Sequence, residues 1–275
     1  MPHIACQDAP MGNGDSQAST DTSMKNVVAI LNQKGGVGKT TVTLGLSAAA
    51  AHAGHRVLVV DLDPQSSASW VLGSDPATTE VSTAEVLGRS GADKAIVPSG
   101  WSDLVHVLPA SNRLQSRETG NPQRLRTALA EVAGNYDAVL IDCPPSLGNL
   151  TTSGLTAADH AIIVVEPSAL GLRGIGAVAD VIDEVWDAHN GLLELSGVIV
   201  NKVPAVSSEA DRRLDELTRI VGKKAIWTPS IPQRVIVNQA IGERRPIHAY
   251  GSRSAEVSEA FDTLWAKLRR MVRRA

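Results

Sequence analysis

Short hydrophobic runs alternate with helix-like segments along most of the chain. The short runs are apolar at nearly every position instead of every second one, which is typical of strands buried on both faces of a sheet. We predict such strands at Val27–Leu31, Arg56–Asp61, Leu104–Leu108, Ala138–Asp142, Ala161–Glu166, Gly197–Asn201 and Ala225–Trp227.

The segments between these runs have the composition or the apolar spacing of helices. We predict helices at Thr40–Ala53, Asn121–Ala133, Leu172–Ala188, Ser207–Val221 and Ala255–Arg274. Strands that alternate with helices across short connections give a doubly wound α/β domain, with a mostly parallel sheet and helices on both faces. Ligands of such sheets bind outside the carboxyl ends of the strands, so candidate chemistry is expected there.

Residues 1–23 lack apolar periodicity and are rich in Ser, Asp, Gly, Gln and Thr, so we expect a disordered arm. Residues 24–275 are expected to form a single domain, and Met24 is a second candidate start. No apolar run approaches the ~20 residues that span a bilayer. Two cysteines in 275 residues cannot build a disulfide framework. We expect a soluble, cytoplasmic protein.

A glycine-rich loop reading QKGGVGKTT follows the first predicted strand over residues 33–41 and leads into a helix. A P-loop requires this context, in which backbone N–H groups and the helix N-terminus bind phosphate. Lys39 can reach the β- and γ-phosphates, and the Thr40 hydroxyl can bind Mg²⁺. We predict that the nucleotide phosphates are held by Lys34, Gly35, Gly36, Val37, Gly38, Lys39, Thr40 and Thr41.

The loop departs from the ordinary P-loop, because Gln33 stands where the first glycine belongs and a second lysine, Lys34, opens the loop. Lys34 cannot easily share its own chain's phosphate cradle with Lys39, but it could reach a nucleotide in a facing subunit. The pattern K-G-G-x-G-K-T resembles the deviant Walker A loop of the ParA/MinD family of P-loop ATPases.

Two further segments resemble that family. Residues 57–65 read VLVVDLDPQ, and residues 138–145 read AVLIDCPP, similar to a Walker B strand. The resemblance implies that Asp63 polarises the attacking water, that Asp61 supports the Mg²⁺ side and that Asp142 holds Mg²⁺ through water. Capping roles are the alternative for Asp61 and Asp63. Cys143, beside the site, is interpreted as a small buried hydrophobe.

The predicted base pocket lies beyond Asn201, which ends a strand and is followed by Lys202, Val203 and Pro204. A guanine-binding NKxD motif would need Asp at position 204, so ATP is favoured over GTP. In the family an Asn at this place contacts adenine, and the segment beginning with Ile-Pro closes the pocket. The resemblance therefore implies roles for Asn201 and Pro232.

Residues 166–174 and 201–212 resemble ParA proteins more than MinD proteins. This implies a Mg²⁺-dependent ATPase, slow without a partner, that forms a homodimer on ATP with each Lys34 touching the other chain's nucleotide. The dimer would grip DNA at the nucleoid without reading its sequence, and a ParB-like centromere-binding protein would stimulate hydrolysis and release the DNA. The implied role is chromosome or plasmid partition, with the cargo left open. A non-enzymatic scaffold is disfavoured by the intact Lys34, Lys39, Thr40, Asp63 and Asp142.

The net charge of −3 hides an asymmetry: residues 201–275 carry +7 and the preceding 200 residues carry −10. A basic C-terminal third indicates a polyanionic partner, although a solvated helical face is the alternative. Candidate DNA contacts are Arg212, Arg213, Lys223, Lys224, Arg234, Arg244, Arg245 and Arg253, with Arg269, Arg270, Arg273 and Arg274 on the last helix.

Soj-like proteins tend to carry an arginine five residues after the Ile of the Ile-Pro pair. Here that position is Ile236, and Arg234 lies two residues earlier. We hypothesise that Arg234 and the pair Arg244 and Arg245 contribute to DNA binding.

The last helix leaves a rival hypothesis open. An apolar stripe at helical spacing is flanked by arginines; the stripe is formed by Phe261, Leu264, Trp265, Leu268, Met271 and Val272. A basic amphipathic helix is also how MinD-type ATPases hold an anionic membrane surface. We favour packing of the stripe onto the sheet, or DNA binding, over membrane association.

Overall fold

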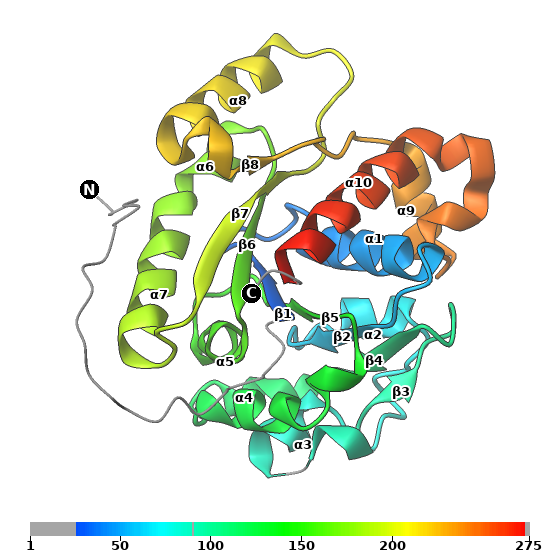
Figure 1. Ribbon diagram of the computed structural model, residues 1–275, viewed down its shortest axis with the longest axis vertical. Helices are drawn as coiled ribbons and strands as arrows, with labels where there is room; N and C mark the ends of the chain where they lie inside the picture. The colour runs from blue at the N-terminus through cyan, green and yellow to red at the C-terminus, as the bar shows by residue number, and fades with distance from the viewer. Residues whose placement is uncertain (1–25, 90, 273–275) are drawn as a thin grey trace, which may run out of the picture.

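The computed structural model describes residues 26–89 and 91–272, and one eight-stranded sheet forms its centre (Figure 1). The spatial order is β3-β4-β2-β5-β1-β6-β7-β8, with every neighbouring pair parallel except β3 and β4. The strands are β1 Val27–Leu31, β2 Val57–Asp61, β3 Val97–Pro98, β4 Val105–Leu108, β5 Ala138–Asp142, β6 His160–Val165, β7 Glu194–Val200 and β8 Ile226–Trp227. The predicted doubly wound α/β fold is confirmed, whereas the predicted arm at residues 1–23 lies outside the described residues.

Helices cover both faces of the sheet (Figure 1). On one face lie α1 Lys39–His52, α2 Ser67–Val71, α9 Val235–Gly242 and α10 Ala255–Val272. The other face is covered by α3 Thr83–Gly88, α4 Gln123–Ala130, α5 Asn149–Ala157, α7 Ile175–Ala188 and the inner side of α8 Ser208–Val221. The short helix α6, Ala169–Arg173, precedes α7.

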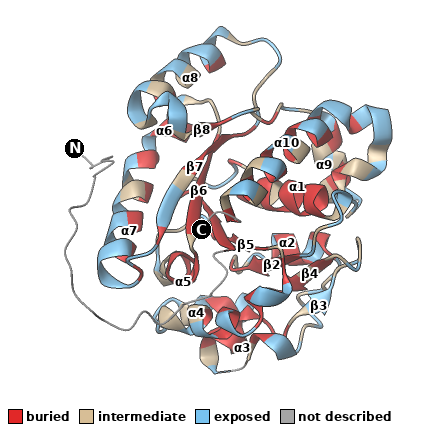
Figure 2. Cartoon of the chain, in the orientation of Figure 1, coloured by how far each residue is buried: buried red, intermediate tan, exposed pale blue. Residues whose placement is uncertain are grey.

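The strands are apolar throughout because each one feeds two cores. In β1, Val28 and Ile30 belong to the core beneath α1 and α10, whereas Val27, Ala29 and Leu31 belong to the core on the other face. The central strands are accordingly buried along their length (Figure 2). The parallel pairing of β5 with both β1 and β2 places the carboxyl ends of these three strands side by side.

The apolar stripe of α10 packs inside the fold. Phe261, Leu264, Trp265, Leu268 and Val272 are each at most 8% exposed and face the core that α1 shares. The close approach of the two helices depends on Gly45 of α1, since a Cβ there would lie 2.2 Å from the Phe261 ring. Most of the stripe is therefore covered by the protein itself, as the packing alternative requires. Among the described residues, no helix is long and apolar enough to cross a membrane.

One predicted helix is divided. The predicted helix at Leu172–Ala188 is observed as the end of α6 and the whole of α7, separated at Gly174. The short helices α2, α3, α5 and α9 were not predicted, because five to nine residues give too little apolar periodicity to recognise.

Candidate nucleotide-binding site

The glycine-rich loop joins β1 to α1 and is fixed by its backbone conformation. Gly36 and Gly38 have φ values of 81° and 96°, in the left-handed region that favours glycine. A Cβ at Gly38 would lie 2.1 Å from the side-chain nitrogen of Asn201, so only glycine fits there. The Val37 side chain is fully buried and anchors the loop between these two glycines.

Asn32, which the sequence analysis did not single out, holds the start of the loop. Its Nδ2 donates to the Val164 carbonyl of β6 at 2.6 Å, and its Oδ1 accepts from the Lys34 N–H at 2.9 Å. In the sequence, a polar residue directly after an apolar strand is the signal that could have identified Asn32. Asn32 sets the direction in which the chain leaves the sheet toward Lys34.

Thr40 and Asp142 meet at the carboxyl end of β5. The Thr40 hydroxyl donates to Asp142 Oδ2 at 2.7 Å, and the Thr43 hydroxyl lies 3.4 Å from Asp142 Oδ1. Asp142 is 1% exposed, and burial, followed by the nearby Asp61 carboxylate, raises its pKa to about 8. A hydroxyl and a carboxylate oxygen in contact are the hard ligands that suit Mg²⁺, so this pair fits the predicted metal site.

Asp61 is the register partner of Asp142 across β2 and β5, and both are buried. Its Oδ1 accepts from the Asp63 N–H at 3.0 Å, and its Oδ2 accepts from the Ser69 N–H and hydroxyl at 2.8 and 2.7 Å. Burial raises the pKa of Asp61 to about 6. With both oxygens engaged, Asp61 holds the turn that carries Asp63 and the first turn of α2.

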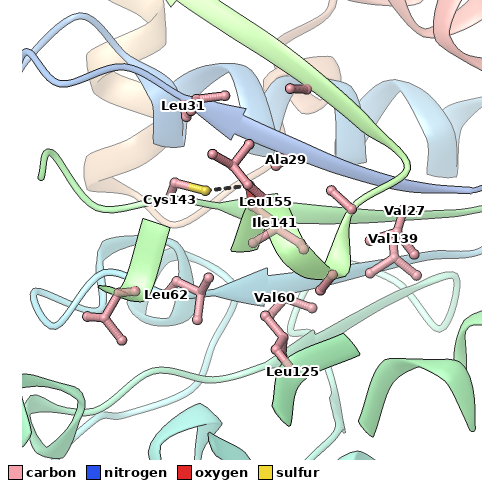
Figure 3. Close-up of a cluster of buried hydrophobic side chains, with 14 of the residues drawn as sticks. Val27, Ala29, Leu31, Val60, Leu62, Leu125, Val139, Ile141, Cys143 and Leu155 are labelled. Atoms are coloured by element: carbon pink, nitrogen blue, oxygen red, sulfur yellow. Dashed lines mark hydrogen bonds between the residues drawn. The ribbon is translucent and has the colours of Figure 1, made fainter. Parts of the chain in front are cut away.

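Asp63 stands at the mouth of the site. Its side chain is half-buried, and Oδ1 accepts from the Gln65 N–H at 2.9 Å. This contact fits the capping alternative for Asp63, while its charge also acts on the pKa of Lys39 and of Asp142, so the carboxylate lies near both. Cys143, by contrast, lies among Ile141, Leu62 and Leu155 in the core (Figure 3). Burial raises the pKa of its thiol, which agrees with a packing role.

The two loop lysines have different surroundings. Lys39 is buried, with its Nζ 3.4 Å from the Lys34 carbonyl; burial lowers its pKa, and the neighbouring Asp142 charge opposes that shift. Lys34 is half-exposed and forms an ion pair with Glu166, which follows β6. Burial raises the pKa of Glu166, but hydrogen bonds from Lys34 and Ser168 outweigh it, so the net pKa is lowered.

The end of β7 supports the loop from the other side. The Asn201 side chain donates to the Val37 carbonyl at 2.9 Å, and Lys202 Nζ donates to the Gly36 carbonyl at 2.6 Å. Pro232 is bridged to Val203, where the Val203 N–H donates to the Ile231 carbonyl at 3.0 Å. The structure thus brings Asn201 to the phosphate loop and places Pro232 beside the segment that follows it.

The candidate DNA contacts fall into separate groups. Arg212 and Arg213 pair with Glu209 on their own helix, and Arg234 pairs with Glu256. Lys223 and Lys224 are exposed in the turn after α8, Arg269 pairs with Asp137, and Arg270 is exposed. Arg244, Arg245 and Arg253 gather around aromatic rings. Arg273 and Arg274 lie outside the described residues.

Comparison with known proteins identifies the family of the chain. The family described as "AAA domain" matches residues 25–195. The sporulation initiation inhibitor protein Soj of Bacillus subtilis is 34% identical over 242 residues, covering 85% of this chain and 95% of its own. The chromosome partitioning protein ParA of Myxococcus xanthus is 32% identical, covering 83% of this chain and 82% of its own. Among solved structures, cobyrinic acid a,c-diamide synthase from Mycobacterium smegmatis with bound ADP and magnesium has a TM-score of 0.78 at 31% identity, covering 91% of this chain and 96% of its own. The chain therefore belongs to the ParA/Soj-type family of P-loop ATPases.

Proposed function

We propose that the protein is an ATP-driven partition switch that dimerises on ATP, binds DNA without sequence preference and releases it after hydrolysis. The observation that carries the proposal is the combination of the half-exposed Lys34 at the loop entrance with the Thr40–Asp142 contact behind it. A protein that only bound a nucleotide would need the Thr40–Asp142 contact but no second lysine at the entrance of the loop.

In this proposal residues 34–41 surround the phosphates of ATP, and Lys39 neutralises the β- and γ-phosphate charge. Thr40 and Asp142 would hold Mg²⁺, which would supply charge neutralisation on the phosphate oxygens. Asp61 keeps the turn that carries Asp63 and the start of α2 in place through its hydrogen bonds to Asp63 and Ser69. Asp63 orients the attacking water as a weak activator, so we expect a slow intrinsic rate.

Asn201 and Pro232 are the proposed contacts for adenine. Asn201 contacts the phosphate loop, and Pro232 is bridged to Val203, which is two residues after Asn201. Both residues therefore lie close to the loop that would hold the phosphates, which supports this role. Pro204 offers no carboxylate to a guanine, which favours ATP over GTP.

Two subunits would meet across the phosphate loops, with each Lys34 contacting the other chain's nucleotide. Dimerisation doubles the basic surface of the C-terminal third. Phosphate-dominated DNA binding of this kind is steeply salt-dependent and indifferent to sequence. A ParB-like protein would stimulate hydrolysis and release the dimer, so that the protein resides at the nucleoid while ATP-bound.

The test is DNA binding by an Asp63→Ala variant with ATP against ADP, over a salt series. The variant should accumulate the ATP dimer and bind a random-sequence duplex with ATP only, with affinity that falls as salt rises. Lys39→Ala, which removes the phosphate lysine, is the matched control and should bind in neither state. Binding to anionic vesicles instead of DNA would overturn the partition proposal in favour of a membrane-positioning ATPase.

A further inference from the structure

Trp70 connects the nucleotide site to a distant arginine. Its side chain lies on α2, directly after Ser69, whose N–H and hydroxyl both bind the Asp61 carboxylate. Trp70 is 42% exposed, and its ring lies under the Arg244 guanidinium at 5.1 Å from centroid to Cζ. A single short helix therefore joins the carboxylate turn of the nucleotide site to Arg244.

Arg244 is also held through its backbone. It adopts a φ of 54°, and its carbonyl accepts a hydrogen bond from Trp101 Nε1 at 2.9 Å. Val71 of α2, Trp101 and Ile241 of α9 line the same small apolar cavity, so α2 and the end of α9 face one another. The position of Arg244 thus depends on α2 and on the loop that carries Trp101.

Two further arginines lie beside Arg244. Arg245 and Arg253 both stack on Tyr250, at 5.3 and 5.9 Å from the ring centroid, and Arg253 donates to Gln239 at 2.8 Å. Glu243 lies beside them: it accepts from the Tyr250 hydroxyl at 2.6 Å and from Gln239, and the charges of Arg245 and Arg253 add to these hydrogen bonds in lowering its pKa.

The surroundings of these arginines differ from those of the candidate arginines that pair with carboxylates. Within the part of the chain that the structure describes, Arg244, Arg245 and Arg253 form no ion pair with a carboxylate, in contrast to Arg212, Arg213 and Arg234. A guanidinium that stacks on a ring keeps its N–H edge available for phosphate oxygens, whereas one paired with a carboxylate does not.

We propose that Arg244, Arg245 and Arg253 form the phosphate-contacting part of the DNA surface and that Trp70 positions Arg244, coupling this surface to the Asp61–Ser69 turn. The inference rests on the proposed function. A change in residues 61–69 on ATP binding moves α2 through Ser69 and carries Trp70 and the stacked guanidinium with it. DNA affinity would then respond to the nucleotide within one subunit, in addition to any effect of dimerisation.

The experiment compares full-length variants by fluorescence anisotropy on a random-sequence duplex, with ATP and with ADP, over a salt series. Replacing all three arginines by alanine should weaken ATP-state binding at least about tenfold and reduce the salt slope by about one per arginine. Trp70→Ala should reduce the ratio of ATP-state to ADP-state affinity by about threefold or more, with ATP binding unchanged. Trp70→Phe, which keeps a ring, should restore the ratio.

Two matched controls test whether position matters. Trp186→Ala removes another exposed tryptophan, on α7, and Arg219→Ala removes another exposed arginine, on α8; both should behave as the unaltered protein. Unchanged binding by the triple variant would overturn the assignment of the surface, and an unchanged ratio in Trp70→Ala would overturn the coupling, while the proposed function stands in both cases. If the unaltered protein binds no duplex in either state, or binds anionic vesicles through these arginines, the proposed function itself is wrong and the inference falls with it.

Discussion

Lys34 forms an ion pair with Glu166 of its own chain, across the gap between the phosphate loop and the end of β6. Ser168 Oγ lies 3.5 Å from the same Nζ and also donates to Glu166, so the lysine is held in place by neighbouring groups. In the proposed dimer this lysine contacts the nucleotide of the other subunit. The ion pair with Glu166 must therefore weaken before Lys34 can reach the nucleotide of the other subunit.

The first prediction is that Glu166→Gln promotes ATP-dependent dimerisation, because the neutral side chain holds Lys34 less tightly. We expect the dimer dissociation constant with ATP to fall about threefold to tenfold, which corresponds to roughly 1 kcal/mol for a partly exposed ion pair. Sedimentation velocity with ATP and with ADP measures it. Glu131→Gln, at an exposed glutamate after α4, is the control. Weaker dimerisation in Glu166→Gln would show that Glu166 acts in the dimer and does not restrain Lys34.

The second prediction concerns the two loop glycines. Gly38→Ala should reduce ATP affinity at least about a hundredfold, because its Cβ would collide with Asn201 and the loop would lose its conformation. Gly36→Ala is the matched control: it has a similar positive φ, but no atom lies within 4 Å of the added Cβ. It should show only the backbone cost of about 1–2 kcal/mol. Titration with a fluorescent ATP analogue measures both, and equal losses would mean that backbone strain alone governs the loop.

The third prediction concerns the buried carboxylate Asp142. Burial raises its pKa to about 8, from an ordinary value of 3.8 that also describes the unfolded chain. The folded protein therefore binds a proton between these values that the unfolded chain has released, and Asp142 lowers stability as pH rises from about 4 to 8. Asp142→Asn removes this titration and keeps an oxygen for the Thr40 hydroxyl.

Without nucleotide, Asp142→Asn should match the unaltered protein near pH 5 and exceed its stability near pH 8 by about 4 kcal/mol, or roughly 8–16 °C in Tm, since each pH unit of this titration contributes about 1.4 kcal/mol. Thermal unfolding followed by circular dichroism across this pH range measures the difference. Asp103→Asn, at an exposed aspartate, is the control and should show no such trend. A difference that stays constant from pH 5 to pH 8 would contradict the assigned titration.

Most of the sheet and the glycine-rich loop between β1 and α1 could be predicted from the sequence, because both follow from local patterns. Fully apolar runs identify strands that feed two cores, and the glycine spacing of residues 33–41 reflects a backbone conformation. The supporting contacts could not be predicted in the same way. The partner of Lys34 lies 132 residues away, and Trp70 meets an arginine that follows α9, so only the packed sheet brings them together. One short helix did carry a local signal: Ser82 and Glu85 form the capping box at the start of α3.

The last prediction concerns the packing of α10 on α1. Gly45→Ala should destabilise the protein by about 2–4 kcal/mol, because its Cβ would lie 2.2 Å from the Phe261 ring, which is 1% exposed and has no room to withdraw. Gly176→Ala is the matched helical control: nothing lies within 4 Å of the added Cβ in α7, so helix propensity alone should stabilise the protein by about 0.5–1 kcal/mol. Urea unfolding measures both. Adding Phe261→Leu to Gly45→Ala should recover part of the loss, since the smaller side chain makes space for the methyl group. Because α1 begins at Lys39, this packing also fixes the helix that carries Thr40. If Gly45→Ala proves neutral, α10 does not hold α1 in the way that the contact with Phe261 indicates.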